Sequence, residues 1–162
     1  MFKNICITTV WTLAALFSTT LNAQQLPKSG SINIHTGLRD VGEAKNVAEK
    51  QMQGHGSVIG TSFNDKGSGP LHGGPALCFY TFFVADNGVK NKGYCAFGDA
   101  DGDRIFTDWH GSGVADGTEG TNNIVSGTGK YAGIQGSGQW KCRNAGPSGD
   151  LSCTQRLDYR LP

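Results

Sequence analysis

The sequence lacks an excess of charge of either sign, with 14 Lys and Arg residues against 13 Asp and Glu residues. Lys3 is the only charged residue among the first 23, so the rest of the chain balances basic and acidic residues. A surface that binds nucleic acid normally shows as a basic stripe or cluster, and this sequence has none. We therefore expect a domain close to neutral, with no nucleic-acid partner.

A hydrophobic run long enough to span a membrane is also missing. The longest run, Ile5–Phe17, has about 13 residues, whereas a membrane-spanning helix needs roughly 20. It ends in small and polar residues up to Ala23, which is typical of a cleavable signal peptide. We predict a signal peptide over residues 1–23, a periplasmic or secreted protein, and no membrane insertion after cleavage. An N-terminal anchor that stays uncleaved is the alternative. Residues 24–162 have the length of one domain.

No C-x-x-C pair is present, and the cysteine spacings do not fit a zinc site. Removal of the predicted signal peptide takes away Cys6 and leaves four cysteines: Cys78, Cys95, Cys142 and Cys153. An even number of cysteines in an exported chain indicates a disulfide framework, here with three conceivable connectivities.

Strand register selects one of these connectivities. Placing Cys142 opposite Cys153 also places Trp140 opposite Gln155, across a loop of the Gly-Pro-Ser-Gly type. We therefore predict a Cys142–Cys153 disulfide. The pair Cys78–Cys95 follows by elimination, and because these two cysteines flank a single predicted hairpin.

Proline is scarce, with 5 residues, whereas glycine is abundant, with 25, and the glycines follow no three-residue period. Short runs of aromatic and β-branched residues between glycine-rich turns are typical of an all-β sandwich or barrel. Residues 39–53 are predicted as either a short helix or a long loop. We predict eight strands, at residues 31–38, 55–63, 76–84, 93–98, 104–113, 121–127, 136–143 and 151–161.

The strand predicted at residues 76–84 is apolar on both faces. Such a pattern indicates a strand that is buried on both sides, or one that lies at a subunit interface. A homodimer through this strand is therefore one hypothesis.

The run from Ser126 to Gly138 ends one strand, turns through Gly129 and Gly133, and starts another strand at Gly136. Together with the hairpin Gly93–Phe106, it resembles the allene oxide cyclase and dirigent-like β-barrel superfamily, especially its exported bacterial members. The resemblance implies an eight-stranded antiparallel up-and-down barrel, in agreement with the predicted strand count. It also implies an interior able to hold one small apolar ligand. The shared motif is a turn, so no catalytic residue is carried over.

Motifs for phosphate binding or nucleophilic catalysis are absent. Lys130 is followed by Tyr131 where a phosphate loop needs Ser or Thr, and no nucleophile elbow occurs. Asp99, Asp101 and Asp103 alternate along a turn and are candidate calcium ligands, because Ca²⁺ prefers oxygen donors. A hairpin turn with solvated acids is the favoured interpretation of these three residues. We expect no cofactor.

Two further sets of residues are candidates for chemistry or binding. Asp108 and His110 share one strand face; inside a barrel they would form a base with its orienting partner, and outside they would be surface residues. The exterior placement is favoured, so no catalytic residue is predicted. Aromatic side chains that would line a hollow interior, and otherwise belong to the core, are Trp109, Trp140, Phe79 and Phe97.

These observations favour an exported, non-catalytic β-barrel that binds a small apolar or aromatic ligand, or contacts another envelope component. The first alternative is an enzyme of cyclase or isomerase type acting on a small apolar substrate. The second is a structural or self-associating exported protein. Polar groups converging on a cavity would favour the enzyme, an aliphatic and aromatic lining would favour binding, and a filled barrel would favour association.

Overall fold

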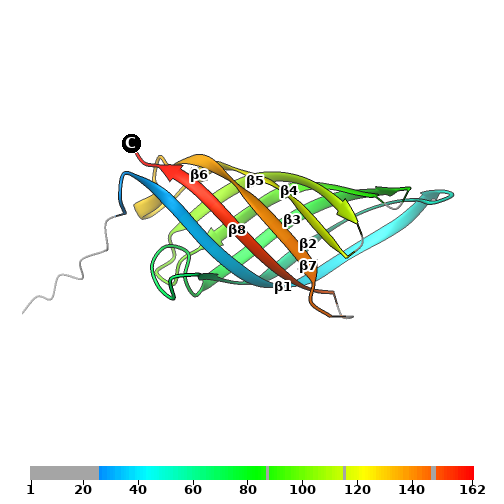
Figure 1. Ribbon diagram of the computed structural model, residues 1–162, viewed down its shortest axis with the longest axis horizontal. Coiled ribbons are helices and arrows are strands. Elements are labelled where there is room, and N and C mark those ends of the chain that lie inside the picture. The colour runs from blue at the N-terminus through cyan, green and yellow to red at the C-terminus, as the bar shows by residue number, and fades with distance from the viewer. Residues whose placement is uncertain (1–25, 87, 115, 147–148) are drawn as a thin grey trace, which may run out of the picture.

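The computed structural model describes residues 26–86, 88–114, 116–146 and 149–162, in which the chain forms a closed antiparallel barrel (Figure 1). Each strand pairs with the next one along the chain, and β8 closes the barrel against β1. The predicted all-β, eight-stranded up-and-down barrel is confirmed. The predicted signal peptide lies outside the described residues. The strands are β1 (Ser29–Ala48), β2 (Gln51–Asn64), β3 (Gly74–Ala85), β4 (Gly88–Gly98), β5 (Arg104–Val114), β6 (Gly117–Gly127), β7 (Gln135–Asn144) and β8 (Asp150–Arg160).

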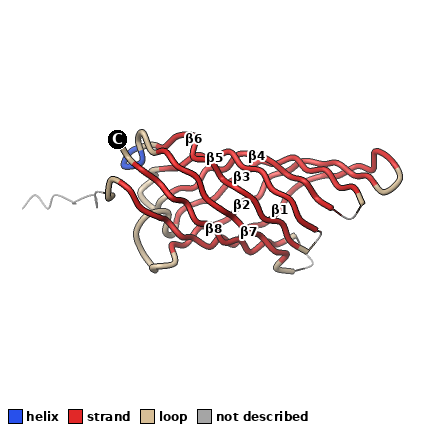
Figure 2. The backbone as a smooth tube through the Cα atoms, turned by 45° about the horizontal axis from the view of Figure 1, so that its top comes forward, coloured by secondary structure: helices blue, strands red, loops and turns tan. Residues whose placement is uncertain are grey.

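Residues 39–53, predicted as a helix or a loop, instead continue β1, turn at Lys50 and begin β2. Figure 2 shows these strands as part of the sheet. The apolar spacing that indicated a helix is weak, and Gly42 within a helix would cost about 1 kcal/mol relative to alanine. The extended conformation is favoured over a helix, because pairing between β1 and β2 satisfies backbone hydrogen-bonding groups of both strands over this length.

Both predicted disulfides are present. Cys142 pairs with Cys153 in the predicted register, with Trp140 opposite Gln155. Cys78 pairs with Cys95 across the β3–β4 hairpin. All four cysteines point into the barrel, so the two disulfides cross-link neighbouring strands from the inside.

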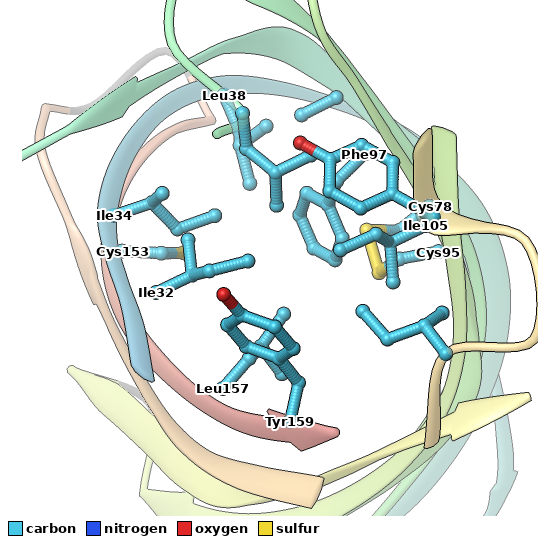
Figure 3. Close-up of a cluster of buried hydrophobic side chains, with 14 of the residues drawn as sticks. Ile32, Ile34, Leu38, Cys78, Cys95, Phe97, Ile105, Cys153, Leu157 and Tyr159 are labelled. Carbon is cyan, nitrogen blue, oxygen red and sulfur yellow. A yellow bond between two sulfur atoms is a disulfide. The ribbon is translucent and has the colours of Figure 1, made fainter. Parts of the chain in front are cut away.

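One end of the barrel, called here the closed end, is filled with apolar side chains. It contains the start of β1 and the end of β8, and Figure 3 shows Ile32, Phe97 and Ile105 pointing inward from the ring of strands. These three side chains are at most 1% exposed. Burial of such side chains contributes roughly 1.5–3 kcal/mol each, which makes this end the stabilising core.

The glycine run that carried the resemblance caps the closed end. It forms a short 3-10 turn, η1 (Gly129–Tyr131), with Gly129 and Gly133 at positive φ, as their place in the turns predicts. The turn drives Tyr131 into the barrel, where its side chain is fully buried and its hydroxyl donates to Asp99 at 2.5 Å. Burial, together with that hydrogen bond, raises the pKa of Tyr131.

The strand β3 has one inward and one outward apolar face. Tyr80 and Phe82 point into the barrel, whereas Phe79 and Phe83 point out and are 60% and 39% exposed. The strand is therefore not buried on both sides within one chain. Its outward face remains a candidate for self-association.

Candidate functional site: a cavity in the open half of the barrel

The half of the barrel opposite the closed end, called here the open half, contains a cavity of about 500 Å³. Its walls come from all eight strands, and both disulfides line it. Its volume falls within the range of roughly 300–1,000 Å³ that is typical of small-molecule sites. The residues at its mouth include Met52, Val84, Val89, Val114 and Leu151.

Glycines on the wall explain why this half is hollow, although aromatic residues line it. Tyr80 lies across from Gly56, which in turn lies across from Gly42. A Cβ added at Gly42 or Gly56 would lie 2.6 or 2.7 Å from the Tyr80 hydroxyl. Phe82 covers Gly54 in the same way, with 2.6 Å to the added Cβ. The rings therefore lie flat over bare backbone instead of filling the interior.

The two tryptophans follow the same arrangement on the other side of the cavity. Trp109 lies opposite Gly93, whose added Cβ would be 2.9 Å from the indole, and Trp140 reaches across β6 to Gly111. The indole rings contact each other edge to face, with centroids 5.2 Å apart and planes at 80°. Edge-to-face contact is a favourable geometry for aromatic pairs, so this contact holds both rings against the wall.

One carboxylate lies on the cavity wall. Tyr80 donates its hydroxyl proton to Asp40 Oδ1 at 2.6 Å. Burial of the phenol, together with the adjacent carboxylate, raises the pKa of Tyr80. The pair therefore holds a neutral phenol beside a carboxylate.

The floor of the cavity, towards the closed end, is a hydrogen-bonded chain of one buried hydroxyl and two buried amides. Thr107 donates to Asn122 Oδ1 at 3.3 Å, and Asn122 Nδ2 donates to Gln155 Oε1 at 2.7 Å. Buried polar groups are tolerated when they are hydrogen-bonded to one another, as here. The floor is thus polar, whereas the mouth is mostly apolar, with Arg143 and Asn144 at the end of β7 as polar exceptions.

Three buried polar atoms of the lining have no hydrogen-bond partner in the described part of the chain. They are the indole nitrogens of Trp109 and Trp140 and the Oδ1 atom of Asn91. A buried donor or acceptor without a partner costs roughly 1–3 kcal/mol. Because all three atoms are buried within the wall, a bound molecule could pair with them only after their side chains turn toward the cavity.

The structure divides the predicted aromatic ligand-binding residues into three groups. Trp109 and Trp140 line the cavity, as predicted for a hollow barrel. Phe97 belongs to the closed-end core and has no exposed surface. Phe79 lies on the outer surface, because it occupies the opposite strand parity to Tyr80.

Asp108 and His110 lie on the outer face of β5 and do not reach the cavity. Asp108 accepts a hydrogen bond from Asn123 at 2.8 Å. The alternation along β5 points Trp109 inward and its two neighbours outward. This is the exterior placement that the sequence favoured, so Asp108 and His110 cannot act as a base and its orienting partner within the cavity.

Asp99, Asp101 and Asp103 do not converge on a cation position. Lys130 Nζ lies 2.8 Å from Asp99 and 2.6 Å from Asp101, and the Lys130 backbone N–H donates to Asp103 at 3.0 Å. Among the described residues, no group of three acidic, His or Cys side chains is placed to hold a metal ion. The three carboxylates instead fasten η1 to the closed end.

A larger hollow of about 920 Å³ lies on the outer surface of β1–β6. Most of its side chains occupy outward positions and are charged or polar, including Lys90, Lys92 and Glu119. Outward charged residues on a sheet are the ordinary solvated face. The interior cavity, with its buried atoms that lack partners, is the stronger candidate site.

Sequence reasoning missed Asp40, Tyr80 and Asn91. Asp40 lies in the stretch 39–53, which was predicted as a helix or a loop, so the alternation that points its side chain inward was not considered. Tyr80 lies in the strand predicted at residues 76–84, which is apolar on both faces, so its inward direction could not be predicted. The signal that would have found the pair is the alternation of glycines at Gly42, Gly54 and Gly56 opposite aromatic positions of β3.

No family model matches the sequence, and a search of the curated proteins gives no significant match. The structure is similar to that of the pterocarpan synthase dirigent protein GePTS1, with a TM-score of 0.51 and 17% sequence identity. The similarity covers 85% of this chain and 94% of that protein. The chain therefore has the dirigent-like β-barrel fold.

Proposed function

We propose that this protein is an exported, non-catalytic β-barrel that binds one small ligand with an apolar body in the cavity of its open half. The observation that carries the proposal is the cavity itself, which glycines keep open between aromatic walls. Two disulfides support an oxidising, extracytoplasmic compartment. In the described part of the chain, no helix is long and apolar enough to cross a bilayer. The structural neighbour is described as a dirigent protein, in keeping with a barrel that receives small molecules.

The atoms without partners define the chemistry of the ligand more closely. The indole N–H groups of Trp109 and Trp140 have no acceptor in the described part of the chain, and a small turn of either ring would present its N–H to a ligand in the cavity. A planar or aliphatic body that carries a carbonyl-type oxygen fits this lining. A pure hydrocarbon would leave both donors buried and unsatisfied.

Binding of the apolar probe N-phenyl-1-naphthylamine, followed by its fluorescence, tests the proposal. Val89→Trp places a large side chain in the mouth, and Lys90→Trp places the same side chain on the outer face of the same strand. We expect the first variant to weaken binding about tenfold or more and the second to leave it unchanged. Equal binding by both variants would place the probe elsewhere and contradict the proposal.

The pair fluorenone and fluorene tests the oxygen acceptor, since the two differ by a carbonyl in place of a methylene. We expect fluorenone to bind about tenfold more tightly, because it satisfies one or both indoles. Trp140→Phe or Trp109→Phe keeps a ring and removes the N–H, and should reduce this preference without weakening fluorene. A preference that survives both substitutions would contradict the role of the indoles.

A cyclase- or isomerase-type enzyme is the second candidate, favoured by the Asp40–Tyr80 pair on the cavity wall. A phenol held beside a carboxylate can donate its proton to one position of a bound substrate while the carboxylate accepts a proton from another position, and the proton then passes from Asp40 back to Tyr80. Chromatography and nuclear magnetic resonance of ligands recovered after incubation separate the two functions, because both methods distinguish isomers of equal mass. An enzyme returns a changed molecule that Tyr80→Phe returns unchanged, whereas a binding protein returns the same molecule in both cases.

A further inference from the structure

The strand β1 extends well beyond its partner β8. It has 20 residues, but its pairing with β8 ends at Arg39, opposite Asp150. From Asp40 to Ala48 it pairs only with β2, and Figure 1 shows this hairpin projecting past the other strands at the end away from the C-terminus. Among the described residues, no strand pairs with the outer edge of this segment, called here the free edge.

The direction of the backbone groups along the free edge follows from one hydrogen bond. The Asp40 N–H donates to the Gly149 carbonyl at 2.9 Å, so the backbone groups of Asp40 point away from β2. Backbone N–H and C=O groups alternate sides along an antiparallel strand. The N–H and C=O groups of Gly42, Ala44 and Asn46 therefore also point outward from this edge.

The free edge carries little of the protection that exposed edges usually have. Proline is absent from it, and its outward-facing side chains include Val41 and Val47, which are 62% and 48% exposed. Its only charged residues after Asp40 are Glu43 and Lys45, one of each sign. An unprotected edge is a template for pairing with another strand.

We propose that the free edge pairs with the free edge of a second copy of this chain, antiparallel, about a two-fold axis at Ala44. In this register the backbone groups of Gly42, Ala44 and Asn46 meet those of the second copy. Glu43 of each copy lies opposite Lys45 of the other, and Val41 lies opposite Val47. The interface is isologous, as two-fold symmetry requires.

Charge selects this register over its neighbours. An axis at Glu43 would place two glutamates opposite each other, and an axis at Lys45 would place two lysines opposite each other. Like charges directly opposite one another destabilise an antiparallel pair, whereas opposite charges stabilise it. Ala44 is also the middle of the segment 40–48, so the register with matched charges is the one that uses the whole free edge.

Sedimentation velocity of the chain without residues 1–23, over a range of concentrations, measures the dimer. Glu43→Lys should weaken the dimer about tenfold, because two attractive pairs become repulsive. Lys45→Glu alone should do the same. The double variant Glu43→Lys with Lys45→Glu should restore the dimer, since the charges are exchanged and still matched.

The backbone itself is tested at Ala44. Ala44→Pro removes an N–H that points outward and is not used in the pairing with β2, so it should abolish the dimer and leave the barrel folded. Ala44→Thr keeps the N–H and should preserve the dimer. Thermal unfolding of both variants checks that the barrel is intact.

Cross-linking tests the register directly. Val41 and Val47 form a non-hydrogen-bonded pair in the proposed dimer, with Cα atoms about 4.5 Å apart, close enough for a disulfide. Mixed Val41→Cys and Val47→Cys proteins should form a covalent heterodimer faster than either forms a homodimer. A monomer at all concentrations would overturn the proposal. So would a dimer that Ala44→Pro leaves intact and that Phe79→Ser, on the outer face of β3, dissociates.

Discussion

The closed end and the open half of the barrel are built from the same eight strands, yet one is packed and the other is hollow. At the closed end, inward positions carry large apolar residues such as Ile34, Phe97 and Leu157, none of which is exposed. In the open half, aromatic residues also point inward, but the positions across from them are glycines. The open half is thus hollow because glycines allow the aromatic rings to lie flat against the wall. It does not lack large inward-pointing side chains.

The largest expected effect is loss of packing at the closed end. Phe97→Ala should lower the free energy of unfolding by about 3–5 kcal/mol, because it leaves a cavity in a close-packed region. Val89→Ala, at the mouth of the open half, should cost less than about 1.5 kcal/mol, since the region is already hollow. Denaturant unfolding of both variants checks the contrast. Equal costs would show that the two halves are packed alike.

Loss of a disulfide should come next. Replacing Cys142 and Cys153 together by alanine should cost about 3 kcal/mol, because the closed loop spans a sequence separation of 11. The barrel should still form at low temperature, since the closed-end core is untouched. Urea unfolding with near-ultraviolet circular dichroism measures both quantities. A variant that unfolds completely would mean that the open half, and not the core, maintains the fold.

Replacing a glycine of the cavity wall by alanine should cost less stability than the two changes above, but it should weaken ligand binding. Gly111→Ala adds a Cβ that would overlap the Trp140 indole and lie 2.6 Å from the Glu119 carbonyl oxygen, so Trp140 must move into the cavity and β5 must shift slightly against β6, at a cost of about 1–3 kcal/mol. We expect weaker binding of N-phenyl-1-naphthylamine as well. Gly37→Ala is the matched control, because its added Cβ has no atom within 4 Å. Unchanged probe binding in Gly111→Ala would show that this glycine is not needed to keep the cavity open.

The smallest effect concerns pH at the closed end. The folded protein raises the pKa of Tyr131 above its ordinary value of about 10, through burial and the hydrogen bond to Asp99. The unfolded chain therefore loses this proton first, and stability should fall as the pH rises above about 10. Tyr131→Phe should cost about 1 kcal/mol at neutral pH, a difference that shrinks at alkaline pH. A difference that is constant from pH 7 to 11 would contradict this linkage.

The sequence predicted those parts of the fold that local pattern determines. The register of one hairpin predicted the Cys142–Cys153 disulfide, with Trp140 opposite Gln155. The glycines at 129 and 133 predicted a turn, because tight turns need positive φ. These predictions required only neighbouring residues or one hairpin.

The candidate site was harder to predict, because it depends on which residues meet across strands. Trp109 and Trp140 were predicted correctly as lining residues. Phe79 and Phe97 are aromatic residues in similar strands, yet Phe79 lies on the outer surface and Phe97 lies in the closed-end core. The parity of β3 is ambiguous in sequence, since both of its faces are apolar. The Asp40–Tyr80 pair joins two residues 40 positions apart, a contact that no local pattern predicts.

Native mass spectrometry of the disulfide-bonded chain, recorded before and after incubation with excess fluorenone, tests the central claim most directly. We predict one small molecule per chain under gentle conditions, either retained from the producing cell or taken up as fluorenone, and its release on denaturation. The Val89→Trp variant should retain none, and Lys90→Trp should behave as the parent protein. A bare mass for the parent protein in excess fluorenone would contradict a ligand-binding cavity in the open half.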